Sequence, residues 1–226
     1  MKSWFQIDSI IEKGERGNYP IFFSKQKPRI INIFFLIDCS GSMMGRRIEE
    51  VNHACSEVLC NFDVINPNVS IKVNVLKFGT SVEWMSPYPM PIKEFMWRPI
   101  ESYGLTSFGE ACSELNQKMS LNGFFSSKEI IMKSLLILMT DGEPTDDYAD
   151  SLQSLLQNPY FINSHRFAIG IGNDYNQSLL AKFAGAKKVF ELTDEGDNSY
   201  LKPMLERIMQ IGLYAASYAA LNEENN

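Results

Sequence analysis

The feature that most constrains the fold is an apolar run from Ile30 to Ile37, which ends at Asp38 and is interrupted only by Asn32. A run without alternating polar residues is typical of a strand that is buried on both faces of a parallel sheet. It is much too short to cross a bilayer as a helix. We therefore predict a central strand in a sheet that is covered by helices on both sides.

Helical and strand patterns alternate along the rest of the chain. Apolar residues recur every three or four positions from Met44 to Phe62, before Pro67, whereas Val69 to Phe78 begins with a period of two. Further strands are predicted at Val82–Trp84, Leu135–Met139, Arg166–Ile171 and Val189–Leu192, and further helices at Phe108–Met119, Tyr148–Leu156 and Leu201–Ile211. This order predicts an α/β, Rossmann-like, doubly wound fold with a mostly parallel six-stranded sheet and one antiparallel edge strand.

The length and composition fit one domain. The chain has 226 residues, of which 45% are hydrophobic and 21% charged, and these are globular proportions. Turn-forming residues dominate the first part, so we assign residues 1–28 to an N-terminal extension and 29–221 to the domain. Residues 222–226 are expected to be a frayed tail.

Charge and cysteine usage exclude several classes of function. The formal net charge is −6, and no stripe of Lys and Arg is present that could neutralise a nucleic acid backbone. Asp8 and Glu12 interrupt any apolar core of a signal peptide. The four cysteines have no zinc-site spacing and are expected to be buried, reduced thiols. We therefore expect a cytoplasmic protein that binds neither nucleic acid nor membrane.

Asp38, Ser40 and Ser42 follow the central strand at alternate positions, so a turn would bring their oxygens together. Carboxylate and hydroxyl oxygens suit a hard divalent cation such as Mg²⁺ or Mn²⁺. Gly41 is expected to allow the turn through a positive φ. Taken alone, however, a serine-rich turn after a strand is also an ordinary cap for the next helix.

Two further segments favour the metal site. Thr106 lies on a loop before a predicted helix, and Asp141 ends another predicted strand. In a doubly wound sheet, the ligand site lies at the carboxyl ends of the strands, where both residues could reach it. We expect the Thr106 hydroxyl to be on an exposed loop.

These three segments resemble the metal-ion-dependent adhesion site of von Willebrand factor type A (VWA) domains. The resemblance implies that Ser40, Ser42 and Thr106 ligate one Mg²⁺ through their hydroxyls. It also implies that Asp38 and Asp141 act directly or through water. One departure is Leu105, because the family usually has a small residue there. A larger residue at this position would shift the loop and weaken the metal site.

Residues 139–147 resemble a subgroup of cytosolic bacterial VWA proteins that are encoded with tellurium-resistance and other stress-response genes. The neighbours of that subgroup often include a protein kinase-like protein and a metal-dependent phosphatase, which are candidate partners. Asp146 and Asp147 are expected in the first turn of the following helix rather than as extra ligands. Glu143 lies beside the predicted site, where it could tune the metal.

The predicted function is metal-dependent binding of a protein that supplies an acidic residue, without enzyme activity. One alternative is a magnesium-dependent phosphohydrolase, but neither His53 nor His165 is expected to reach the site as a base. The other alternative is a scaffold whose metal site is degenerate. Residues 85–97 are rich in residue types that are favoured at interfaces, so they are either a second candidate surface for a partner or a loop packed on its own sheet.

Overall fold

The computed structural model describes residues 9–12, 21–24, 27–62, 69–194 and 200–223. Within the predicted N-terminal extension, strands β1 (Ser9–Glu12) and β2 (Ile21–Ser24) pair antiparallel in a sheet of their own. The rest of that extension up to residue 26, and residues 224–226 of the predicted tail, lie outside the described residues.

The main sheet has the strand order β10-β9-β8-β3-β4-β5, with β3 (Arg29–Asp38) at its centre. The other strands of this path are β4 (Val69–Phe78), β5 (Val82–Trp84), β8 (Leu135–Thr140), β9 (His165–Ile171) and β10 (Val189–Leu192). All of the pairs are parallel except β4 with β5, so the predicted fold class and antiparallel edge are confirmed. The two-residue strands β6 (Met90–Pro91) and β7 (Ile130–Ile131) extend the sheet to eight strands, because each pairs briefly beside this path.

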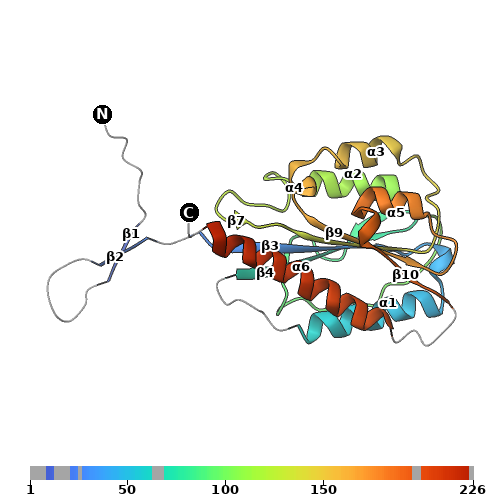
Figure 1. Ribbon diagram of the computed structural model, residues 1–226, viewed down its shortest axis with the longest axis horizontal. Coiled ribbons are helices and arrows are strands. Elements are labelled where there is room, and N and C mark those ends of the chain that lie inside the picture. The colour runs from blue at the N-terminus through green and yellow to red at the C-terminus, as the bar shows by residue number, and fades with distance from the viewer. Residues whose placement is uncertain (1–8, 13–20, 25–26, 63–68, 195–199, 224–226) are drawn as a thin grey trace.

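Helices cover both faces of this sheet (Figure 1). One face carries α1 (Arg46–Cys60) and α6 (Leu201–Glu223). The other face carries α2 (Phe108–Lys118), α3 (Ala149–Leu155), α4 (Pro159–Ile162) and α5 (Gln177–Ala184). The sequence patterns did not predict α4 or α5. Both are short, and each begins at an asparagine whose side chain accepts backbone N–H groups.

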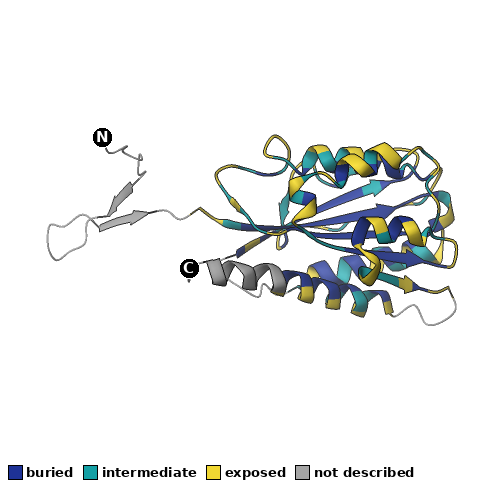
Figure 2. Ribbon diagram, turned by 45° about the horizontal axis from the view of Figure 1, so that its top comes forward, coloured by how far each residue is buried: buried dark blue, intermediate teal, exposed yellow. Residues whose placement is uncertain are grey.

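The apolar run that predicts β3 lies in two separate cores. Ile33, Phe35 and Ile37 face α1 and α6, whereas Phe34 and Leu36 face the helices of the opposite side. All five side chains are fully buried, and the strands form the buried layer of Figure 2. Because both faces are covered, β3 has no exposed face, and even its polar residue Asn32 is buried, where it accepts a hydrogen bond from Asn74.

Two predictions, one for the end of the last helix and one for the burial of a cysteine, need correction. Helix α6 continues to Glu223 and so includes the first two residues of the predicted tail. Cys60 is exposed near the end of α1, whereas Cys39, Cys55 and Cys112 are buried free thiols as predicted. None of the helices in the described residues is both long enough and apolar enough to cross a membrane.

Candidate metal centre at the carboxyl ends of the strands

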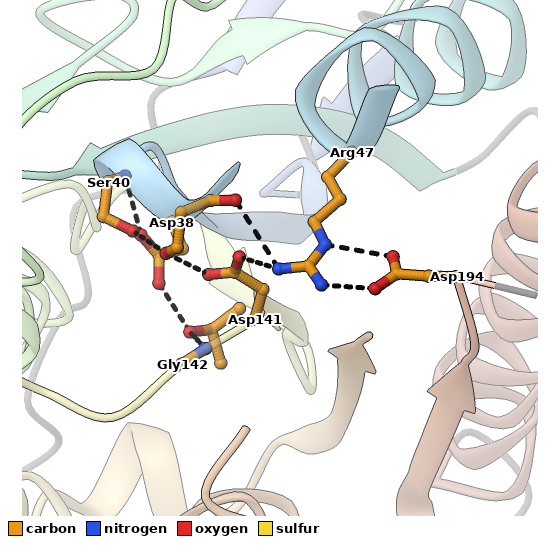
Figure 3. A network of polar contacts seen from close by, with 8 residues as sticks. Asp38, Ser40, Arg47, Asp141, Gly142 and Asp194 are labelled. Carbon is orange, nitrogen blue, oxygen red and sulfur yellow. Dashed lines mark hydrogen bonds and ion pairs between the residues drawn. The ribbon is translucent and has the colours of Figure 1, made fainter. Parts of the chain in front are cut away.

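Four of the five predicted metal ligands form one hydrogen-bonded network (Figure 3). Ser42 Oγ donates to Asp141 Oδ1 at 2.8 Å, and the hydroxyls of Ser40 and Ser42 lie 3.0 Å apart. Asp38 Oδ1 accepts the backbone N–H of Ser40 at 2.8 Å. The parallel strands β3 and β8 bring these residues together, because their carboxyl ends lie side by side at Asp38 and Asp141.

Asp38 is the buried anchor of this network. Its side chain is fully buried, and its second oxygen accepts a hydrogen bond of 2.6 Å from the hydroxyl of Thr140. Burial raises the pKa of Asp38, because desolvation outweighs the hydrogen bonds from Thr140 and Ser40 that favour its charged form. A cation at this position would therefore offset an existing cost of burying charge.

The loop between Asp38 and α1 turns through the short 3₁₀ helix η1 (Gly41–Met43) without a positive φ at Gly41, so that expectation was wrong. The positive φ of 78° instead belongs to Gly104, which faces Gly41 across a 3.0 Å backbone hydrogen bond. A side chain on Gly104 would collide with the hydroxyl of Thr80. The positive φ angles of these two loops therefore belong to Gly104 on the neighbouring loop and to Gly45 just before α1, rather than to Gly41.

Thr106 is buried, with 5% of its surface exposed, which contradicts the expectation of an exposed loop hydroxyl. Its backbone is fixed by Thr145, whose N–H donates to Thr106 O and whose hydroxyl accepts the Thr106 N–H, each at 2.9 Å. Among the described residues, no hydrogen bond joins the Thr106 hydroxyl to the four-residue network. The structure therefore places Thr106 on the adjoining loop without linking its side chain to the other predicted ligands.

Leu105 does not displace this loop. Its backbone N–H donates to Thr80 Oγ1 at 3.1 Å, and its side chain is 56% exposed. The larger residue is accommodated because it points into solvent instead of into the site.

Arg47 is a residue of the site that sequence reasoning missed. Its Nη1 lies 2.5 Å from Asp141 Oδ2, and its Nε donates to Asp194 Oδ1 at 3.0 Å (Figure 3). Arg47 is the second residue of α1, and its distance from Ser42 in the sequence gives no periodic signal that could have identified it. Asp194 lies beyond the end of β10, and no sequence pattern connects it with Arg47.

The acidic residues after Asp141 have separate structural roles. Asp146 accepts the backbone N–H groups of Gly109 and Glu110 at 3.1 Å each, so it caps α2 rather than the following helix. Asp147 accepts the N–H of Ala149, the first residue of α3, but it lies before the N-cap residue Tyr148 rather than in the predicted first turn. Glu143 accepts a hydrogen bond from Asn176 at 2.7 Å.

The von Willebrand factor type A domain model matches residues 32–203, which includes the sheet and the whole network. The chain belongs to the VWA domain family. Relatives of this VWA domain include inter-alpha-trypsin inhibitor heavy chain H4 of Bos taurus, 26% identical over 80% of this chain, and heavy chain H6 of Homo sapiens, 29% identical over 72%. The chain spans only 21% and 13% of those two proteins, respectively.

Solved structures share the fold at low identity. A von Willebrand factor type A protein from Catenulispora acidiphila has a TM-score of 0.60 and 18% identity, and the match covers 80% of this VWA domain chain and 42% of that chain. Proximal thread matrix protein 1 from the mussel byssus, described with a zinc-occupied MIDAS motif, has a TM-score of 0.57 and 18% identity. That match covers 80% of this chain and 47% of the other.

The donor set of this VWA domain fits a hard cation. Within the part of the chain that the structure describes, no group of three or more His, Cys, Asp or Glu side chains could hold a metal ion. A metal here would therefore need the serine hydroxyls as well as the carboxylates. The convergence of Ser40, Ser42 and Asp141 supplies oxygen atoms alone, which are the donors that Mg²⁺ and Mn²⁺ prefer.

Neither histidine lies in this network. His53 is an exposed residue of α1 that faces Glu57. His165 is the first residue of β9, paired with Leu135 at the amino end of the parallel strands, as predicted. Burial lowers the pKa of His165, because its charged form is desolvated.

Proposed function

We propose that this VWA domain binds one Mg²⁺ or Mn²⁺ ion and uses it to bind a protein partner. Ser40, Ser42 and Thr106 would supply hydroxyl ligands, and Asp38 and Asp141 would act directly or through water. The observation that carries the proposal is the continuous network from Ser40 through Ser42 to Asp141, in contacts of 3.0 and 2.8 Å. The zinc described in the mussel protein supports a divalent ion at this kind of site.

Ser42 is the solvent-exposed member of the four-residue network. Asp38, Ser40 and Asp141 are each no more than 2% exposed, whereas Ser42 is exposed. A metal held against Ser42 would therefore keep a coordination position toward solvent. A carboxylate from a partner is the ligand that matches this position, because the bound ion retains positive charge when most ligands are neutral hydroxyls.

Large exposed apolar side chains lie on the two loops of the site. Met44, Tyr103 and Leu105 are 66%, 60% and 56% exposed, and they belong to the two loops joined by the Gly41–Gly104 hydrogen bond. Interfaces commonly place such residues around a central polar contact. We therefore include these three side chains in the partner surface, with the metal at its centre.

Binding is better supported than catalysis. A metal-dependent phosphohydrolase would need a base near the attacking water. The two histidines lie elsewhere, and the Asp38 carboxylate is already engaged by Thr140 and Ser40. The proposed role is therefore adaptor-like and without turnover.

A scaffold with a degenerate, metal-free site is the second candidate. The observation that favours it is Arg47, since its guanidinium already supplies positive charge to Asp141. In that case the partner would contact the domain without any dependence on divalent ions.

The cellular setting is also part of the proposal. A cytoplasmic role in a bacterial stress-response or tellurium-resistance system, with a kinase-like or phosphatase partner, rests on the resemblance of residues 139–147. The relatives named above support the VWA family and leave this narrower setting to experiment.

Affinity purification from the native cell tests the proposed function. The baits are the wild-type chain, Ser42→Ala and the control Ser154→Ala, which removes an exposed hydroxyl from α3. We expect a protein to be retained in Mg²⁺ by the wild type and the control, to be released by EDTA, and to be missing with Ser42→Ala. The same retention by all three baits in Mg²⁺ and in EDTA would favour the scaffold.

A further inference from the structure

Arg47 is held by two carboxylates from different strand ends. Its Nη1 contacts Asp141 Oδ2 at 2.5 Å, while its Nε and Nη2 form a fork onto both oxygens of Asp194. Two parallel bonds between a guanidinium and a carboxylate fix orientation as well as charge. Only 20% of the Arg47 side chain is exposed, compared with 45% for Asp194.

The backbone leaves space for this guanidinium. Gly172, just after β9, has a φ of 76°, and a Cβ atom on it would lie 2.8 Å from Arg47 Cζ. The same atom would lie 3.0 Å from Asp194 Oδ2. The guanidinium of Arg47 is therefore surrounded by three segments, which follow β8, β9 and β10.

Both carboxylate oxygens of Asp141 already accept a hydrogen bond. Its Oδ1 accepts from Ser42, and its Oδ2 accepts from Arg47. The guanidinium of an arginine stays charged in any ordinary buffer. A divalent ion that approaches Asp141 therefore meets a fixed positive charge in contact with the carboxylate it needs.

We propose that Arg47 is an internal competitor for the metal at Asp141, and that Asp194 limits this competition by holding the guanidinium. The inference rests on the proposed metal site and adds to it a residue that sets metal affinity. When the ion binds, Arg47 gives up Asp141 and remains paired with Asp194. The affinity for Mg²⁺ then depends on how strongly Arg47 pairs with Asp141 compared with Asp194.

Calorimetric titration with MgCl₂ tests this through four proteins: wild type, Arg47→Met, Asp194→Asn and the double variant. Arg47→Met removes the charge and keeps an unbranched apolar stem, so Mg²⁺ should bind on the order of tenfold more tightly, within the range of coupling between contacting groups. Asp194→Asn should weaken binding, because Arg47 then pairs with Asp141 alone. In the double variant, the effect of Asp194→Asn should be much smaller.

The matched control is Arg46→Met, which removes the neighbouring charge of α1 that pairs with Glu50 instead of Asp141. It should change Mg²⁺ affinity much less than Arg47→Met does. Thermal melts add a second readout: the rise in Tm caused by Mg²⁺ should be larger for Arg47→Met than for wild type, because the stabilisation of the folded state by a ligand grows with the logarithm of its affinity.

The outcomes distinguish failure of the proposed metal site from failure of the proposed competition by Arg47. If the wild type binds Mg²⁺ and Arg47→Met binds it equally or more weakly, Arg47 only positions Asp141, and the competition is overturned while the metal site stands. If Arg47→Met binds Mg²⁺ and the wild type does not, the competition is supported in its strongest form. If no variant binds Mg²⁺ or Mn²⁺, both the metal site and the competition are overturned.

Discussion

The two candidate partner surfaces of this domain differ in how their polar groups are used. At the carboxyl edge, the polar groups of Asp38, Ser40, Ser42 and Asp141 converge on one another. In the aromatic loop, which we define as residues 85–99, the polar groups instead bind the loop to its own domain. Trp97 Nε1 donates to Asn52 Oδ1 at 3.0 Å.

The loop is also fixed at its far end. Asn52 accepts the N–H of Ile100 at 2.7 Å and donates to the carbonyl of the same residue at 2.9 Å. Although Met96 is 84% exposed and a cavity of about 310 Å³ lies between the loop and the end of α1, Phe95 and Trp97 pack against the core. Aromatic composition alone therefore does not identify a binding surface, because tryptophan and phenylalanine also anchor long loops.

The largest expected effect is on metal affinity, which should depend on the carboxyl edge and not on the aromatic loop. Asp38→Asn removes the buried charge and nearly preserves shape, so Mg²⁺ affinity should fall about 100-fold, the upper end of effects seen around metal sites. Trp97→Ala should leave it unchanged. Calorimetry on both variants makes the comparison, and a similar loss in each would mean that the aromatic loop contributes to the site.

The second effect concerns stability. Trp97→Ala should lower the free energy of unfolding by about 2 kcal/mol, roughly half the cost of truncating a fully buried tryptophan. The half-buried ring packs on the core, and Asn52 loses one hydrogen-bond donor. Urea unfolding of the metal-free protein measures this. A change in the free energy of unfolding below about 0.5 kcal/mol would mean that Trp97 does not anchor the loop, which would then remain a candidate partner surface.

The smallest effect concerns the rim. Leu105→Ser should weaken partner binding about fivefold and leave stability within about 0.5 kcal/mol, because the side chain is largely exposed. Leu121→Ser is the matched control, since Leu121 is 53% exposed and outside the two site loops. Binding measured against the partner isolated in Mg²⁺ decides whether Leu105 belongs to the interface, and equal affinity for both variants removes it.

Much of this fold was predictable because its signals are local. The apolar run of β3, interrupted only by Asn32, predicts a buried strand. Asp38 ends this strand, and Asp141 follows the end of the adjacent parallel strand β8. The family model confirms the VWA fold that these features predict. The ligand assignments themselves stay predictions until a metal is measured.

The remaining features depend on contacts between distant parts of the chain. Arg47 and Asp194 are separated by 147 positions, and Asp146 caps a helix that begins 38 residues earlier in the chain, at Phe108. Gly104 needs its positive φ because of Thr80, a neighbour only in space. A pattern confined to one segment contains no information about such partners.

Titration of the metal-free wild-type protein with MgCl₂ in a calorimeter, repeated with MnCl₂, tests the central claim most directly. The account predicts one saturable site per chain, weakened about 100-fold in Asp38→Asn and unchanged in the control Asp150→Ala, which alters an exposed aspartate of α3. Binding of equal strength in all three proteins, or saturable binding by none of them, would contradict the account.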